Sequence, residues 1–544
     1  MSGSGQLPHT LGQIERGLGA LLLVLVVALH VILLLNGGGL WRDEANTVQL
    51  ANLATLGEVW KYLQFDSFPI LWLLVVRAWT AALGPDLYRV LGFLVGLGIV
   101  GALCWNVRRT LVPVPLFALL LLAFNPALIR YGDSVRAYGF GVLLFLVTFG
   151  LVWKVATAPT RRNVAAATIL ALLSVHALYY NAVLLLALCA GGAAVTMRHR
   201  QWRRLGLLVA IGGIAAVSLL PYVSTIQAAS EWNGGIRIPN FDLAWFWGQL
   251  SRTAASSGEM MVWVWVALFF AGTAVGICVQ VSPRWLHASD EQADRALFCV
   301  TVLLVGTLGY FIFLKILSYP TQPWYYVALL ALMAMSLEFL LSLLANRVFG
   351  RILRLLVVVP AVLLTFGTTA EQAHLRHTNI DIIARQLEKA ADPQDFILVN
   401  YWYYGVSFQN HYRGSAPWTT VPPIADHRFH RYDLAIDQMK RPDPAEALKP
   451  SIDQIAATLR TGHTVWIVGA VLFLKPGERA LEMPRGEDAK QEGPYFNAWS
   501  QQVGRFLQEH ANRIDRILVP ATGPMGPYEN VQFLRAQGWK EAGQ

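Results

Sequence analysis

Two acidic residues stand where a carboxylate could do chemistry. Asp43 and Glu44 come soon after an apolar run, residues 18–35, that is long enough to cross a bilayer. Acidic side chains at a membrane boundary are costly unless they face a cavity, so the pair suits a site for a substrate that is part lipid and part sugar or phosphate. The alternative is that both residues cap and solvate the helix that follows, and the sequence leaves the two interpretations open.

Cationic side chains recur at the ends of later apolar runs. Residues 130–138 form a turn with two guanidinium groups, Arg130 and Arg136. Arginine suits phosphate because its planar fork donates two parallel hydrogen bonds, whereas an arginine that snorkels and pairs with Asp133 is the structural alternative. Lys315, near the end of its own run, would either snorkel or neutralise a lipid phosphate.

Composition fixes the class of protein. The chain has 544 residues, 55% of them hydrophobic and 14% charged, and its mean hydropathy of +0.45 indicates a protein with many membrane spans. The apolar runs stop near residue 371, so we expect a membrane domain over 1–371 and a separate α/β domain over 372–544. The net charge of +9 lies largely in short loops between spans, which argues against nucleic acid as a partner.

The basic loops predict the topology. They contain Arg108-Arg109, Lys154 with Arg161-Arg162, Arg198 to Arg204, Arg284 with Arg295, and Arg347 with Arg351 and Arg354. All fall on the cytoplasmic side if residues 68–83 lie at the interface or re-enter instead of crossing. The spans are then expected at 17–36, 87–107, 112–130, 136–154, 164–180, 181–197, 204–223, 259–281, 296–317, 324–345 and 352–371, about eleven in all.

This topology places the unusual polar residues on one membrane face. Asp43, Asp66, the 130–138 turn, His176 and Lys315 all fall on the outer side, where the α/β domain also emerges. An interfacial belt of Tyr and Trp would not explain the charged members of this group, so a cavity at that face is the favoured interpretation.

The last third of the chain alternates helical and strand patterns. Expected helices over 380–390, 451–460 and 499–512 precede expected strands over 396–399, 464–469 and 516–519, which predicts a three-layer α/β domain with a largely parallel sheet. No glycine-rich nucleotide fingerprint is present. The run Asp426-His427-Arg428-Phe429-His430 could bind a metal, but a solvated loop is the commoner outcome.

Taken together, these motifs resemble one family. An acidic pair after the first span, the segment Asp66 to Trp72 with Pro69, the turn Ser134-Val135-Arg136-Ala137-Tyr138, the span end His176 to Tyr180 and the span start Trp324-Tyr325 occur in one order. The arrangement resembles the GT-C membrane glycosyltransferases, particularly the protein O-mannosyltransferase and lipid A aminoarabinose transferase group, over roughly the first 370 residues.

The resemblance implies an enzyme of the bacterial inner membrane, with its α/β domain extracytoplasmic, that transfers a sugar from a polyprenyl-phosphate donor to a hydroxyl of a lipid, glycan or protein, with inversion. Asp43 is the implied catalytic carboxylate, with Glu44 next. The candidate substrate and phosphate-binding residues, among which the resemblance supports Arg136 and leaves Lys315 or Arg130 to compensate for a missing arginine, are Arg130, Asp133, Arg136, Tyr138, His176, Tyr179, Lys315 and Tyr325. A divalent cation, Mg²⁺ or Mn²⁺, could assist the reaction with Asp43 or Asp66 as oxygen ligands, although the sequence shows no metal-specific spacing.

The chain differs from the family pattern at three positions, and two other functions are alternatives to a glycosyltransferase. Ser134 stands where the family commonly has an acid, the histidine usual near Pro69 is absent, and Trp324 replaces an arginine. A lone histidine such as His176 is more often a hydrogen-bonded core residue. The rival functions are a transporter or flippase for lipid-linked saccharide, whose usual inverted repeat is not evident, and a receptor for envelope glycans.

The topology can be tested by labelling from outside the cell. In a cysteine-free background, Asp133→Cys should react with an impermeant thiol reagent and Arg108→Cys should not, because only the first lies on the outer face. The reverse pattern would contradict the topology and the shared cavity together.

Overall fold

The computed structural model describes residues 6–108, 112–233, 241–282, 288–484, 492–520 and 523–540. Arg109 and Arg284, from two of the predicted basic loops, lie outside this part. The chain divides into two compact units. The membrane unit is Met1–Leu35, Phe68–Val223 and Ile238–His374, and the α/β unit is Asn36–Ser67, Ser224–Arg237 and Leu375–Gln544. The first loop, with Asp43 and Glu44, therefore belongs to the same unit as the carboxy-terminal part of the chain.

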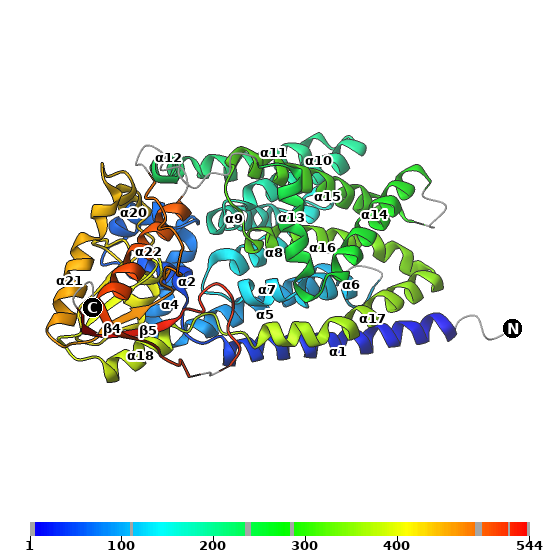
Figure 1. Ribbon diagram of the computed structural model, residues 1–544. Helices are drawn as coiled ribbons and strands as arrows, with labels where there is room; N and C mark the ends of the chain where they lie inside the picture. Colours follow the sequence, from blue (N-terminus) through cyan, green and yellow to red (C-terminus); the bar gives the residue numbers. More distant parts are fainter. Residues whose placement is uncertain are drawn as a thin grey trace. The chain divides into compact units, whose positions relative to one another are not determined.

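All the regular secondary structure among the described residues of the membrane unit is helical. Its elements are α1 (Gln6–Asn36), α4 (Ile70–Leu83), η2 (Pro85–Leu87), α5 (Tyr88–Val107), α6 (Leu116–Ala118), η3 (Leu119–Ala123), α7 (Pro126–Gly132), α8 (Ala137–Thr157), α9 (Arg161–Ala177), α10 (Asn181–Arg198), α11 (Trp202–Ser218), η4 (Leu220–Tyr222), α13 (Leu243–Ala254), η5 (Ala255–Ser257), α14 (Met260–Val281), α15 (Asp290–Leu317), η7 (Pro323–Tyr326), α16 (Val327–Ser342), η8 (Leu343–Asn346) and α17 (Val348–Ala373) (Figure 1).

Nine helices in the described part are long and apolar enough to cross a membrane. The predicted spans at 112–130 and 164–180 are not among the nine. The first is interrupted, because Pro126 starts a new helix and the Asn125 side chain caps it by accepting a hydrogen bond from Ala127 N at 2.8 Å. Helix α4 has 14 residues, a length of about 21 Å that falls short of the hydrocarbon core.

Helix α16 is the centre of the membrane unit, because every residue from Val327 to Ser342 is buried. Its Glu338 accepts hydrogen bonds from the amides of Phe117 and Ala118 at 2.8 and 3.0 Å and pairs with Arg354 at 3.1 Å. Arg354 also lies 3.3 Å from Glu15 of α1. The network joins α1, α6, α16 and α17, and the sequence analysis singles out neither carboxylate.

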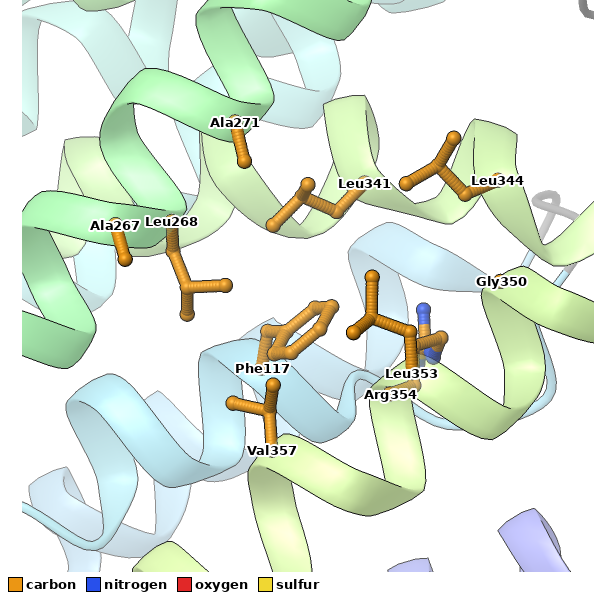
Figure 2. A pocket seen from close by; sticks show the side chains of 10 residues that line it. All are labelled: Phe117, Ala267, Leu268, Ala271, Leu341, Leu344, Gly350, Leu353, Arg354 and Val357. Atoms are coloured by element: carbon orange, nitrogen blue, oxygen red, sulfur yellow. The ribbon is translucent and has the colours of Figure 1, made fainter.

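An apolar cavity of about 200 Å³ lies beside this network. Figure 2 shows side chains from α6, α14, α16 and α17 around it, with Arg354 at one side. The Arg354 guanidinium is held by Glu338, by Glu15 and by the carbonyl oxygen of Val114, 3.1 Å away. The charge at the cavity wall is therefore already compensated within the protein.

Helix α5 lies close to the turn after α7. A Cβ on Gly92 would overlap the backbone carbonyl of Asp133, and one on Gly96 would overlap the Asp133 carboxylate and the His30 ring. Only glycine leaves room for this approach. The space is used by a buried contact of 2.7 Å between His30 Nδ1 and Asp133 Oδ2, which fixes α1 to the turn.

The described residues of the α/β unit form one five-stranded sheet. The strands are β1 (Phe396–Val399), β2 (Trp418–Thr420), β3 (Val465–Val468), β4 (Ala511–Arg516) and β5 (Phe533–Trp539), in the order β2-β1-β3-β5-β4. The unit's helices are α2 (Arg42–Ala51), α3 (Leu56–Tyr62), η1 (Leu63–Phe65), α12 (Val223–Asn233, from Ser224 on), α18 (Ile380–Ala390), α19 (Tyr404–His411), α20 (Tyr432–Met439), η9 (Pro444–Leu448), α21 (Lys449–Arg460) and α22 (Glu492–His510).

Alternate residues of the strands point into two separate cores. Phe396 and Leu398 pack with α20, α21 and α22, whereas Ile397 and Val399 pack with α18 and α19. The predicted three-layer α/β arrangement is therefore confirmed.

The sheet is mixed instead of largely parallel. β1 pairs in parallel with β2 and β3, but β5 is antiparallel to β3 and to β4. The predicted elements 380–390 and 396–399 are confirmed residue for residue. The predicted strand 516–519 is wrong. The strand is Ala511–Arg516, which lies at the edge of the sheet, and its charged residues obscure the apolar pattern by which a strand is recognised.

The close approach of α5 gives a test with a control in the same helix. Gly92→Ala should destabilise the protein by about 1–3 kcal/mol, because the new methyl group displaces the backbone of Asp133. Gly101→Ala should keep or slightly raise stability, since nothing lies near its Cβ and alanine favours the helix. Thermal unfolding of both variants in detergent measures the difference, and equal stabilities would mean that the turn adjusts freely.

Candidate functional site

Helix α2 places the acidic pair at its first turn. Glu44 is fully buried, and one of its carboxylate oxygens accepts a hydrogen bond from the amide of Trp41 at 3.3 Å. The same oxygen lies 3.9 Å from Nδ1 of the buried His377. A glutamate in the first turn that turns back to an amide before the helix satisfies an orphan donor. The capping interpretation thus fits Glu44, and its neighbour is the exposed member of the pair.

Asp43 has two nitrogen-bearing partners. Its Oδ1 lies 3.3 Å from Nε2 of His430 and 3.5 Å from Nε of Arg42. The side chain is 17% exposed, so it can be reached from outside the unit. The first turn of a helix also favours negative charge through the backbone dipoles. A fixed, accessible carboxylate of this kind can accept a proton from a hydroxyl group.

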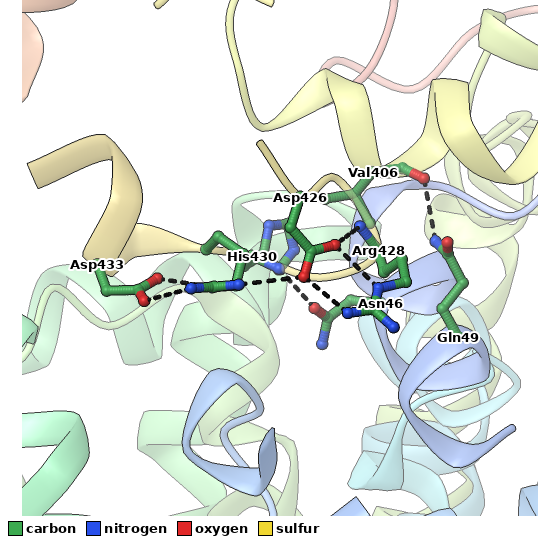
Figure 3. A network of polar contacts seen from close by, with 8 residues as sticks. Asn46, Gln49, Val406, Asp426, Arg428, His430 and Asp433 are labelled. Atoms are coloured by element: carbon green, nitrogen blue, oxygen red, sulfur yellow. Dashed lines mark hydrogen bonds and ion pairs between the residues drawn. The ribbon is translucent and has the colours of Figure 1, made fainter. Parts of the chain in front are cut away.

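The loop that supplies His430 is braced by its own ion pairs (Figure 3). Asp426 accepts hydrogen bonds from Arg428 and Arg431, and Arg431 pairs in turn with Asp433 at 2.7 Å. Burial alone would raise the pKa of Asp426, but the hydrogen bonds and charge of Arg428 lower it below its ordinary value. The backbone amide of His430 donates to Asn46 Oδ1 of α2 at 2.8 Å.

The residues of this loop do not form a metal site. The His427 ring lies 4.5 Å from the Trp418 ring, and burial lowers its pKa to about 4. Asp426 faces arginines, and His430 faces Asp43. Asp66, the other expected ligand, accepts hydrogen bonds from Thr47 at 3.1 Å and from Ser67 N at 2.7 Å. No group of three metal-ligating side chains occurs among the residues that the structure describes.

Glu529 supports the start of helix α2 through hydrogen bonds that the sequence does not predict. It is fully buried, and its Oε1 accepts hydrogen bonds from Ser407 Oγ at 2.6 Å and from the backbone amide of Arg42 at 3.3 Å. Burial raises its pKa to about 7, although the charge of Arg42 opposes this shift. A single glutamate in a loop near the chain end gives no pattern from which this contact could be predicted.

In the membrane unit, the 130–138 turn is buried and surrounded by rings. The Arg136 guanidinium lies 4.4 Å from the centre of the Phe68 ring, and Tyr138 meets the same ring edge-on at 4.9 Å. Tyr325 lies 6.1 Å from Tyr138. The structure thus brings Arg136, Tyr138 and Tyr325 into one aromatic cluster.

The other predicted residues of this unit have separate surroundings. Asp133 is held by His30, and Arg130 is buried at the end of α7. His176 lies 2.9 Å from Tyr222 and 3.1 Å from Ser218, so both ring nitrogens are engaged between helices, and Tyr179 meets Tyr222 edge-on. This fits the hydrogen-bonded core interpretation of His176.

Lys315 is exposed at the end of α15, with Nζ 6.0 Å from the Phe311 ring. Two of the partners had a signal in the sequence: His30 is an ionisable residue within an apolar run, and His430 lies in the run Asp426–His430.

Comparisons with known proteins gave structural neighbours only. No family model and no curated protein matches the chain. ArnT from Cupriavidus metallidurans bound to undecaprenyl phosphate is similar at 13% identity and a TM-score of 0.48, over 83% of this chain and 93% of that chain. The oligosaccharyltransferase of Archaeoglobus fulgidus in the apo form is similar at 11% identity and a TM-score of 0.48, over 82% of this chain and 69% of that one.

The archaeal enzyme in complex with Zn and sulfate is similar at 13% identity and a TM-score of 0.46, over 82% and 67% of the two chains. These neighbours are GT-C membrane glycosyltransferases, the group that the sequence resembles.

The raised pKa of Glu529 predicts a pH-dependent stability. The folded protein binds this proton more tightly than the unfolded chain, so the carboxyl contributes stability that is present below its ordinary pKa of 4.5 and lost as the pH rises to about 7. Glu529→Gln keeps the acceptor oxygen and cannot ionise. The variant should therefore unfold at a higher temperature than the parent at about pH 8, with a smaller difference at about pH 5.

Glu509→Gln, which removes an exposed carboxylate paired with Arg505, is the matched control for the loss of a surface charge. A Glu529→Gln protein that is less stable than the parent at the higher pH would mean that Glu529 is ionised and held by the Arg42 charge.

Proposed function

We propose that this chain transfers a sugar from a polyprenyl-phosphate-linked donor to an acceptor hydroxyl at the outer face of a bacterial inner membrane. The observation that carries the proposal is Asp43: a partly exposed carboxylate in the first turn of a helix, just beyond a membrane-spanning helix, with His430 and Arg42 beside it. A carboxylate in that setting suits a substrate that combines a lipid chain with a sugar.

The assigned reaction is a direct displacement. Asp43 accepts the proton of the acceptor hydroxyl, whose oxygen forms a bond to the anomeric carbon while the bond from that carbon to the phosphate oxygen breaks. The electron pair of the broken bond stays on the phosphate, so a polyprenyl phosphate leaves and the anomeric centre is inverted. A lipid, a glycan or a protein can supply the hydroxyl in this scheme.

A departing phosphate needs a cation. Within the membrane unit we assign this role first to Arg136, which is buried against the Phe68 ring, because a guanidinium shielded from water stabilises developing charge more strongly. Arg130 and Lys315 are the further candidates, and Tyr138 and Tyr325 line the same aromatic cluster as Arg136.

The decisive variant is Asp43→Asn, which keeps the size of the side chain and removes its charge and basicity. Sugar transfer should fall by roughly two to four orders of magnitude, while donor binding and folding persist. Glu44→Gln is the matched control on the neighbouring residue and should cost only about 1 kcal/mol of stability, because it weakens a cap. Transfer of labelled sugar from a polyprenyl-phosphate donor by purified protein in nanodiscs measures both.

Donor binding measured alongside separates the two classes of function. Loss of transfer with intact binding supports an enzyme and excludes a flippase or receptor, for which Asp43 need not be basic. Parental transfer by Asp43→Asn would contradict the assignment, and a severe defect confined to Glu44→Gln would move the catalytic role to that residue.

A further inference from the structure

The geometry points to His430 as a positioning residue for Asp43, supplied by the carboxy-terminal part of the chain to the helix that follows the first membrane span. This inference rests on the proposed function, because it assumes that Asp43 is the base. It gives His430 a role other than the metal binding considered for the run Asp426–His430, and it assigns to the carboxy-terminal part of the α/β unit a part in the reaction.

The first support is the contact itself. His430 Nε2 lies 3.3 Å from Asp43 Oδ1, and the histidine is 7% exposed. Neither ring nitrogen has a hydrogen bond that meets strict geometry within the described residues, so the imidazole is committed to no other acceptor there. Hydrogen bonds of catalytic groups are often long without substrate and shorten when it binds. Asp43 is the acidic side chain that the structure places opposite Nε2.

The second support is that helix α2 carries Asp43 and also holds the backbone of His430. Asn46 lies three residues after Asp43, on the same side of the helix, and its Oδ1 accepts the backbone amide of His430 at 2.8 Å. The Asn46 amide nitrogen donates to Phe65 O at 3.3 Å, which holds the Asn46 side chain in place. The helix therefore sets the position of the His430 backbone, and the His430 ring in turn meets the carboxylate of that helix.

The third support is the rigidity of the loop around His430. Figure 3 shows Asp426 between Arg428 and the arginine that pairs with Asp433. The His430 ring lies edge-on to the Trp402 ring at 6.4 Å and 5.8 Å from the Tyr432 ring. A loop held by ion pairs at its ends and by aromatic packing at its ring can keep an imidazole at one position.

The consequence for the reaction is alignment. A carboxylate on a partly exposed side chain rotates about two bonds, and a displacement of about 1 Å in a reacting group can cost 100-fold in rate. A donor fixed on Oδ1 holds the plane of the carboxylate, so both oxygens keep their direction toward the acceptor hydroxyl. His430 would then raise kcat and leave the affinity for the donor unchanged.

The test compares three substitutions at one position. His430→Phe keeps an aromatic ring against Trp402 and Tyr432 but has no nitrogen, so kcat should fall about 10- to 100-fold with the donor KM unchanged. His430→Gln restores an N–H donor and should recover part of that loss. His430→Ala should be at least as slow as the phenylalanine variant.

His427→Ala is the matched control. This histidine belongs to the same loop, but its ring packs at a tilt against the Trp418 ring, whereas Asp43 faces His430, so kcat should stay near the parental value. Gel filtration and thermal unfolding confirm that each protein is folded. A fall in kcat for His427→Ala equal to that for His430→Phe would overturn the inference, because the loss would then reflect the loop as a whole.

A double variant distinguishes the inference from the proposed function. If His430 acts through Asp43, adding His430→Phe to Asp43→Asn should cause no further loss of transfer. A full additional loss, or parental kcat in His430→Phe alone while Asp43→Asn is inactive, would overturn the positioning role and leave the proposed function standing. Parental transfer by Asp43→Asn itself would overturn both.

Discussion

The pairing of Arg354 with Glu338 is the interaction on which the membrane unit most depends. Glu338 is fully buried in the central helix, and an isolated charge there would cost several kcal/mol. Its oxygens instead meet Arg354 and the two free amides at the start of α6, while Glu15 takes a further side of the same guanidinium. Removing one partner would strand the others in a low dielectric, so the packing of α1, α6, α16 and α17 is coupled through one cluster.

Charged and polar groups in the α/β unit must also find partners, and this requirement decides which carboxylate can react. Helix α2 begins with Arg42, Asp43 and Glu44, and each finds a partner from the later chain: Glu529 for the Arg42 amide, His430 for Asp43 and His377 near Glu44. Glu44 and Glu529 are fully buried, and they accept hydrogen bonds from backbone amides at the start of α2. Asp43 alone of these carboxylates keeps some exposure, and burial therefore separates the carboxylate that can react from those that hold it in place.

Local pattern predicted many elements because a helix or strand depends on neighbours in the sequence. The strand 396–399 is four consecutive buried apolar residues, and the helix 380–390 has its apolar residues at helical spacing, so both follow from periodicity. Two elements did not follow from this local periodicity. The strand Ala511–Arg516 is an edge strand with exposed charges, and the run 112–130 looks continuous although Asn125 and Pro126 divide it.

The sequence by itself determined the membrane class, the helical character of the first two thirds, the α/β character of the rest and the candidate status of Asp43 and Arg136, because these depend on composition and short-range spacing. Only the tertiary structure decided what those residues touch. The contacts Asp43 with His430, Asp133 with His30 and Glu338 with Arg354 join distant elements, and the grouping of residues 36–67 with the carboxy-terminal part is of the same kind. Such pairings arise because a buried charge or amide must find a partner in space, and sequence separation does not record which residues folding brings together.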